Sequence, residues 1–222
     1  IGKTHTLDQE VFLPAHKAGK IKYRAIKGAT TPVQLVKVLY EYRTRDSVVL
    51  MDDNDSIFED RDALNVLKAA LDSYPVRRIS WLSSTDELEE DMKDFLFEGR
   101  VAFITNRNLK TEAESDKKSA VDIAAFLDRV KYMDLKLHSK ASRAAWVVHI
   151  IRTTGMLTKR PEGSKSVTKA QSEAIAKYLE AHWPEMRSVS LRTAGHMADL
   201  IHIVKNVEDA KSWRDLVEAF SL

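Results

Sequence analysis

Short runs typical of β-strands alternate with amphipathic stretches over the first half of the chain. The runs occupy residues 21–26, 48–51 and 100–106, and the second is four apolar residues in succession, VVLM. An uninterrupted run rich in β-branched residues is typical of a strand buried on both faces, as in a parallel sheet. Between the first two runs, residues 30–43 carry a helical apolar pattern that opens at Pro32, a favoured first helical position. The alternation predicts an α/β domain with a parallel sheet flanked by helices.

Other elements are predicted around these runs. A helix before the first run is expected to end near Pro14. After the third run, a helix is followed by a short strand at residues 133–137. Between the second and third runs, Tyr74 and Pro75 break a helix, and residues 76–82 have strand propensity.

From about residue 138 the apolar spacing is helical and no strand pattern recurs. Helical runs cover residues 140–154, 168–182, 189–204 and 208–220. A short chain segment with several helices and no strand is typical of a small all-α domain. We therefore divide the chain into an α/β domain at residues 1–137 and a helical domain at residues 138–222.

Composition narrows the class of protein without identifying it. The 222 residues contain 35 Lys and Arg against 33 Asp and Glu, so any basic surface for nucleic acid must be local. Cysteine is absent, which excludes disulfides and thiolate metal sites and is compatible with a reducing cytoplasm, where we expect the protein. No apolar run approaches the ~20 residues of a membrane span, so no membrane partner is expected.

Acidic residues follow the second predicted strand directly, in the sequence VVLMDDND. Ligands of open α/β sheets bind at the carboxyl ends of the strands, so Asp52 and Asp53 are candidates for holding a cation there. The alternative is a turn in which Asp and Asn side chains cap a following helix, as these residues often do.

The chain begins IGKTHTLD, and Gly2, Lys3 and Thr4 match the closing half of a phosphate-binding loop. In such a loop backbone N–H groups surround the phosphates, the lysine reaches the outer ones and the threonine hydroxyl holds Mg²⁺. The usual pattern is GxxxxGK[ST], and only Ile1 precedes Gly2, so the front of the loop is expected upstream of this sequence. A chance tripeptide is the alternative.

Two later residues could complete a phosphate site. Asn106 ends the third predicted strand, and its amide can both donate and accept, so it could orient a water beside a γ-phosphate. Arg129 lies near the end of the helix that follows and could be offered to a neighbouring subunit's phosphate. The alternatives are an ordinary exit from a strand for Asn106 and a solvated surface residue for Arg129.

The order of these features resembles an AAA+ ATPase over nearly the whole chain. Gly2, Lys3 and Thr4 are similar to the end of the Walker A loop, with Thr4 implied as a magnesium ligand. Asp52 and Asp53 resemble the Walker B pair, which implies that Asp52 holds Mg²⁺ and that Asp53 polarises the attacking water. Asp53 stands where the family usually has glutamate.

The resemblance also implies roles for residues further along the chain. Asn106 stands at the sensor 1 position and Arg129 at the arginine-finger position. The stretch SVSLRTAGHMADLI is similar to the helix that carries the sensor 2 arginine, here Arg192. In this family the helical domain is a lid over the nucleotide.

The implied function is binding and hydrolysis of ATP with Mg²⁺ in a homo-oligomeric ring, by family precedent a hexamer. The compact members found in phage and bacterial replication genes suggest a motor or loader working on DNA. Two alternatives stay open, a protein-remodelling AAA+ ATPase and a nucleotide-gated assembly scaffold with weak hydrolysis. Residues 25–32, AIKGATTP, lack the aromatic residue that protein-threading members usually place there, which weakens the remodelling alternative.

A possible nucleic-acid contact lies between the second and third predicted strands. Arg77 and Arg78 could contact phosphates while Trp81 stacks on a base, as in single-strand-binding proteins, and single-stranded DNA or a replication protein is the implied partner. The interval is also similar to that of superfamily III helicases, which have a basic hairpin there. The alternative is a hairpin at the sheet edge with solvated arginines.

Overall fold

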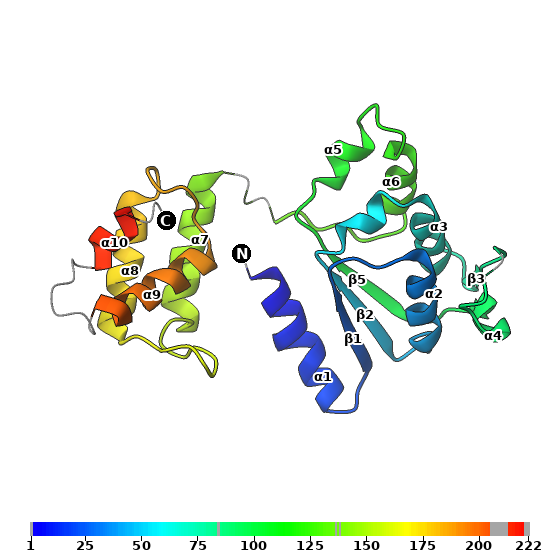
Figure 1. Cartoon of the computed structure of the whole chain (residues 1–222), viewed down its shortest axis with the longest axis horizontal. Coiled ribbons are helices and arrows are strands. Elements are labelled where there is room, and N and C mark those ends of the chain that lie inside the picture. Colours follow the sequence, from blue (N-terminus) through cyan, green and yellow to red (C-terminus); the bar gives the residue numbers. More distant parts are fainter. Residues whose placement is uncertain (1, 84, 136, 138, 205–212, 220–222) are drawn as a thin grey trace. The chain divides into compact units, whose positions relative to one another are not determined.

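The computed structural model describes residues 2–83, 85–135, 137, 139–204 and 213–219. The chain forms two compact units, Lys3–Met133 and a second made of Asp134–Leu222 with Ile1–Gly2 (Figure 1). This division falls a few residues before the domain boundary expected from the sequence. In the described residues no helix is long and apolar enough to cross a membrane.

The first unit is built on a three-stranded parallel sheet. Its strands are β1 (Lys22–Lys27), β2 (Ser47–Asp52) and β5 (Arg100–Ile104), in the order β1-β2-β5. Every residue of the central strand β2 is buried, as its uninterrupted apolar run predicts. The register pairs Asp52 with Lys27 on one side and with Ile104 on the other, so all three strands end at one edge. The predicted parallel α/β sheet is confirmed.

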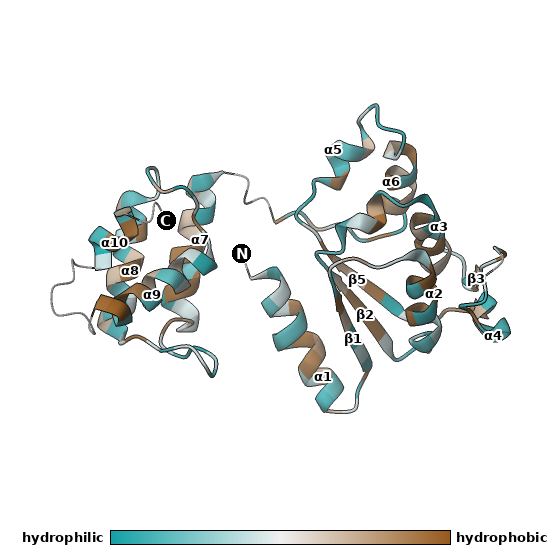
Figure 2. Ribbon diagram, in the orientation of Figure 1, coloured by the Kyte–Doolittle hydropathy of each residue, from teal (hydrophilic) through white to brown (hydrophobic). Residues whose placement is uncertain are grey.

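Helices cover both faces of this sheet. On one face α2 (Pro32–Glu41), α3 (Arg61–Ala70) and α6 (Ala120–Leu127) form the larger core with alternate residues of β2. Thr31 caps α2 by accepting a hydrogen bond from the backbone N–H of Gln34, and Pro32 occupies the first turn as predicted. Figure 2 shows the mainly hydrophobic colouring of β2 and β5 between these layers.

The opposite face is covered by the N-terminal helix, a name used here for a π-helical segment, His5–Phe12, continued by α1 (Leu13–Lys17). Leu7 and Phe12 pack against the smaller core formed by Tyr23 and its neighbours on β2 and β5. The predicted end near Pro14 is wrong. Pro14 lies where the π-helical segment passes into α1, and the helix continues through it to Lys17.

The short strand predicted at residues 133–137 is also wrong over its described part. Residues 131–135 have no regular structure, and Met133 is 82% exposed. A strand needs a neighbouring strand to which its backbone can hydrogen-bond. In the described sheet β5 pairs only with β2. Local propensity alone does not make a strand here.

A small antiparallel hairpin lies between α3 and β5. It consists of β3 (Arg78–Ser80) and β4 (Asp94–Leu96), preceded on the second strand by the single turn α4 (Glu90–Lys93). Ile79 and Phe95 face the main core, and the residues on either side of each are exposed. The strand propensity of residues 76–82 is thus realised over three residues.

In its described part the second unit is helical, as the sequence predicts. Its helices are α7 (Lys140–Thr154), α8 (Lys169–His182), α9 (Leu191–Val204) and α10 (Trp213–Ala219). Thr168 and Gln171 form a capping box at the start of α8, and Gly155 ends α7 in the left-handed conformation. The predicted helices at 140–154, 168–182 and 189–204 are confirmed to within two residues.

Candidate active site at the carboxyl edge of the sheet

Asp52 is the last residue of β2 and lies at the centre of the candidate site. Its side chain is buried, with 4% of the residue exposed, because strands flank it on both sides and the N-terminal helix covers it. The Thr4 hydroxyl donates a hydrogen bond of 2.8 Å to Asp52 Oδ1. The two oxygen ligands that the sequence assigns to a magnesium ion therefore lie together, although 48 residues separate them.

Lys3 lies at the end of the neighbouring strand β5. Its Nζ donates to the Thr105 carbonyl oxygen at 2.5 Å and to Asn106 Oδ1 at 2.9 Å. Gly2, just before it, has a φ of +88°, a left-handed conformation that favours glycine. Lys3 and Thr4, which directly precede the N-terminal helix, thus lie at adjacent strand ends.

Asp53 follows β2 in the left-handed conformation, with a φ of 52°. Its backbone N–H donates to the Ile104 carbonyl oxygen at 3.1 Å, and its exposed carboxylate accepts a hydrogen bond of 3.1 Å from Asn106 Nδ2. Aspartate adopts this conformation more readily than most residues other than glycine, which suits a tight turn after the strand. The turn places the second acid beside the amide.

The alternative reading of the acidic stretch, as a set of helix caps, finds no support at Asn54. That residue precedes a short 3-10 helix, Asp55–Phe58, without a side-chain capping bond. Its Nδ2 donates instead to Thr30 Oγ1 at 2.6 Å, on the loop after β1. The cap of α3 comes from Asp60, further along the chain.

The donor set suits a magnesium ion that arrives with phosphates. Within the described residues, no group of three or more acidic or histidine side chains could hold a metal by itself. Mg²⁺ is commonly held by one or two carboxylates, with phosphate and water oxygens as the other ligands. One buried carboxylate and one hydroxyl, Asp52 and Thr4, fit that pattern.

A network behind the site was not predicted from the sequence. Thr105 Oγ1 donates to Asp55 Oδ1 at 2.6 Å, and Arg107 Nη1 donates to the Asp55 carbonyl oxygen at 3.0 Å. Arg107 also binds Glu112 with Nε, at 3.0 Å, and with Nη2, at 2.5 Å. These bonds join the segment after β5 to the segment after β2. The only signal was the concentration of polar residues after each strand.

The ion pair between Arg107 and Glu112 predicts a dependence of stability on pH. Hydrogen bonding from Arg107 lowers the pKa of Glu112. A carboxyl with a lowered folded-state pKa stabilises the fold above its unfolded pKa, about 4.3 for glutamate, and loses this contribution as pH falls through the folded value. We expect Glu112→Gln to reduce the free energy of unfolding by about 1–3 kcal/mol at pH 7, and by progressively less below about pH 4.3.

Urea denaturation of parent and variant from pH 3 to 8 measures this difference. Glu59→Gln is the matched control, because Glu59 contacts the same arginine at 3.2 Å but is 76% exposed in its side chain. Its loss should cost under about 1 kcal/mol. A Glu112 difference that stays constant with pH would contradict the assignment.

The structure also describes the two other predicted site residues. Arg129 is exposed just after α6, and its Nη1 donates to the Ala125 carbonyl oxygen at 2.5 Å. Arg192 is an exposed residue in the first turn of α9, in the second unit. Their roles as arginine finger and sensor 2 stay predictions.

The residues suggested for nucleic acid are largely engaged within the first unit. Arg77 donates to the carbonyl oxygens of Ala70 and Gly99, both at 3.0 Å, and burial lowers the pKa of its guanidinium. Arg78 is exposed and paired with Asp94 across the hairpin. Trp81 is partly buried against the main core. These contacts favour the hairpin interpretation over a surface built for a nucleic acid.

No protein-family model matches the chain. The chain is 34% identical over 223 aligned residues to an uncharacterized 36.7 kDa protein from the nrdC-mobD intergenic region of Enterobacteria phage T4. The similarity covers the whole of this chain and 65% of the length of that phage protein. A phage relative is consistent with the expected link to phage proteins.

Proposed function

We propose that the protein binds ATP with Mg²⁺ and hydrolyses it as an ATPase of the AAA+ type. The observation that carries the proposal is the meeting of the GKT residues with two strand ends. Lys3 contacts Asn106, 103 residues away, and Thr4 contacts Asp52. Side chains with these roles, separated so far in sequence, meet at the sheet edge where open α/β folds bind ligands.

Each residue then has a defined role. Lys3 would bind the outer phosphate oxygens, and Thr4 and Asp52 would hold the metal ion. Bound Mg²⁺ would neutralise charge on the β- and γ-phosphate oxygens. Helix N-termini favour phosphate because their N–H groups are unpaired, so the start of the N-terminal helix suits this place.

Hydrolysis would use Asp53 and Asn106 together. A water oxygen attacks the γ-phosphorus, the bond to the bridging oxygen breaks, and ADP leaves with that electron pair. Asp53 accepts a hydrogen bond from the attacking water. A proton of this water passes to the Asp53 carboxylate or to a phosphate oxygen. Asn106, which already donates to Asp53 Oδ1, would hold this carboxylate and orient the water.

Assembly and substrate rest on the family resemblance. We propose a homo-oligomeric ring in which Arg129 faces a neighbouring subunit's nucleotide, and its exposed position suits that role. DNA is the proposed substrate class by resemblance alone, because Arg77 and Trp81 are engaged within the fold.

The proposal is tested by comparing the parent protein with Asp53→Asn. We expect the parent to release phosphate from ATP only with Mg²⁺, and the variant to bind ATP within about twofold of the parent. Its turnover should fall by about 10²–10⁴-fold, the usual contribution of a general base. Asp46→Asn, at the other end of β2, is the control, because Asp46 is exposed and far from the strand's carboxyl end. A parent without Mg²⁺-dependent ATP binding would refute the proposal.

A further inference from the structure

Lys27 lies beside the candidate metal site and has no role so far. It is the last residue of β1, and the sheet register places it directly opposite Asp52. Its Nζ lies 3.8 Å from Asp52 Oδ2 and 3.9 Å from Asp8 Oδ2. One exposed ammonium group therefore lies between two buried carboxylates, one on the sheet and one on the N-terminal helix.

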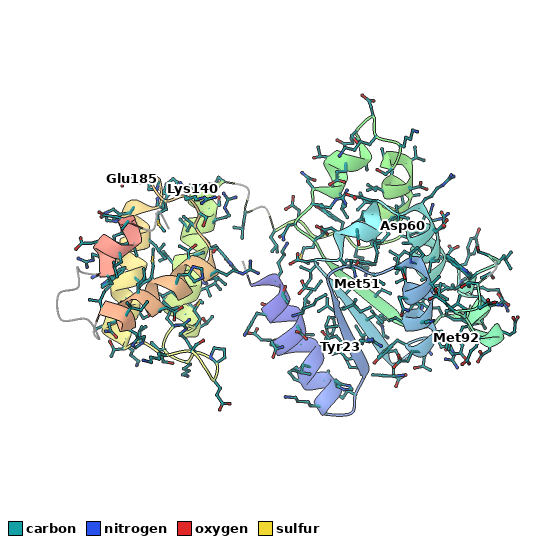
Figure 3. All side chains as sticks on the ribbon, in the orientation of Figure 1. Tyr23, Met51, Asp60, Met92, Lys140 and Glu185 are labelled. Carbon is teal, nitrogen blue, oxygen red and sulfur yellow. The ribbon has the colours of Figure 1, made fainter. Side chains whose placement is uncertain are left out.

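The two carboxylates differ in how well they are held without Lys27. Asp8 Oδ1 accepts a hydrogen bond of 2.8 Å from the hydroxyl of Tyr23 on β1 (Figure 3), and Asp8 Oδ2 accepts one of 3.1 Å from Gln9. Burial and the hydrogen bond to Asp8 raise the pKa of Tyr23, so this phenol stays a donor. Asp52 accepts from Thr4 on Oδ1, and its Oδ2 faces Lys27.

A metal ion at Asp52 would meet this ammonium at close range. Two cations within a few ångströms of one carboxylate repel each other, and burial weakens the screening of that repulsion. Lys27 can withdraw, because its side chain is 59% exposed and water can solvate its ammonium group. Asp8 keeps its hydrogen bonds from Tyr23 and Gln9 when Lys27 moves.

We propose that Lys27 is a built-in counter-ion that competes with Mg²⁺ for Asp52 and is displaced when the metal binds with nucleotide. The proposal rests on the function proposed above and gives Lys27 a role in regulating metal binding at the same site. In the metal-free protein Lys27 neutralises Asp52, which reduces the cost of burying an unpaired carboxylate. On metal binding, the ammonium turns to solvent.

Replacing Lys27 with glutamine should therefore strengthen Mg²⁺ binding. Exposed ion pairs are weak, so we expect the Mg²⁺ midpoint for binding a fluorescent ADP analogue to fall by about two- to fivefold. Affinity for the analogue without Mg²⁺ should stay unchanged. The difference from the parent should shrink at high salt, because salt screens exposed charges.

Lys22→Gln is the matched control. Lys22 is on the same strand at its amino end, has a similarly exposed side chain and contacts Glu41 at 3.9 Å, so the change removes the same charge away from the site. It should leave the Mg²⁺ midpoint unaltered. Thermal melts of both variants would check that each remains folded.

The outcomes separate this inference from the proposed function. A parent that binds no nucleotide overturns the function. A parent that binds nucleotide with Mg²⁺, together with an unchanged Mg²⁺ midpoint in Lys27→Gln, overturns the inference alone. Weaker metal-free binding of the analogue also overturns it, because Lys27 would then be a phosphate ligand.

Discussion

Lys3→Ala is expected to abolish nucleotide binding, whereas Asp52→Asn is expected to reduce chiefly the Mg²⁺-dependent turnover. Losing a charged hydrogen bond to a buried partner costs about 2–5 kcal/mol, or about 30- to 5,000-fold in affinity. Lys3 would supply that interaction to the outer phosphates. Its two contacts at the end of β5, to Thr105 and Asn106, show that its ammonium reaches the strand ends.

Asp52→Asn keeps the shape of the side chain and an oxygen that can accept from Thr4. It removes the negative charge that would attract the metal, so ATP affinity should fall little and turnover by about 10²–10³-fold, the usual effect of losing one electrostatic contact in a transition state. Excess Mg²⁺ should restore part of this turnover. A higher concentration of ATP should not restore the parental turnover in either variant.

Equilibrium binding of ATP and steady-state phosphate release measure both effects. Lys20→Ala is a control for Lys3, because Lys20 is an exposed residue in the turn after α1. Equal ATP affinity and equal turnover in both variants and the parent would show that GKT is a chance tripeptide and that Asp52 has another role.

The central sheet was predictable because its pattern has one simple cause. Four apolar residues before Asp52 indicate a strand covered on both faces, and the structure buries the whole of β2. The end of the N-terminal helix was harder, since a proline usually breaks a helix, yet here the helix runs through Pro14 to Lys17. The sequence does not show that a π-helical segment will precede Pro14.

The strand expected at residues 133–137 failed for a tertiary reason. Apolar residues such as Met133 and Leu135 favour a strand, but a strand is stable only where an adjacent strand forms backbone hydrogen bonds with it. In the described structure these two residues are exposed instead, by 82% and 45%. Pairing partners depend on the whole topology, which local propensity does not include.

The candidate site was likewise predictable from the sequence only in part. Asp52 and Asn106 could be placed near each other because parallel strands end at a common edge. The places of Lys27 and Arg107 in the site could not be predicted, because their contacts depend on strand register and on the direction in which long side chains extend. A shift of β1 by one residue would send Lys27 to the other face of the sheet.

Arg129→Ala is expected to leave ATP affinity nearly intact and to cut turnover by about 10³-fold or more, the contribution of an arginine finger in phosphoryl-transfer enzymes that use one. As the γ-phosphate leaves, charge develops on its oxygens, and a guanidinium against them stabilises that state. In the described contacts Arg129 binds the Ala125 carbonyl at the end of α6, and no contact joins it to Lys3 or Asp52. We therefore propose that it acts on the nucleotide of a neighbouring subunit.

Mixing Arg129→Ala with Lys3→Ala subunits tests this directly. Each variant alone lacks one component of every site, but mixed interfaces combine an intact Lys3 in one subunit with an intact Arg129 in its neighbour. Part of the parental turnover should return in the mixture and depend on protein concentration. Arg61→Ala, an exposed arginine at the start of α3, controls for the loss of surface charge.

Two results would overturn the role in a neighbouring subunit. A mixture without recovery would mean that Arg129 acts within its own chain, because then no subunit would hold a complete site. Parental turnover by Arg129→Ala at every protein concentration would leave the arginine as a cap on α6, with a small loss in thermal stability and no catalytic effect. In that case Arg129 would no longer support a ring, and a monomeric ATPase would be the better description.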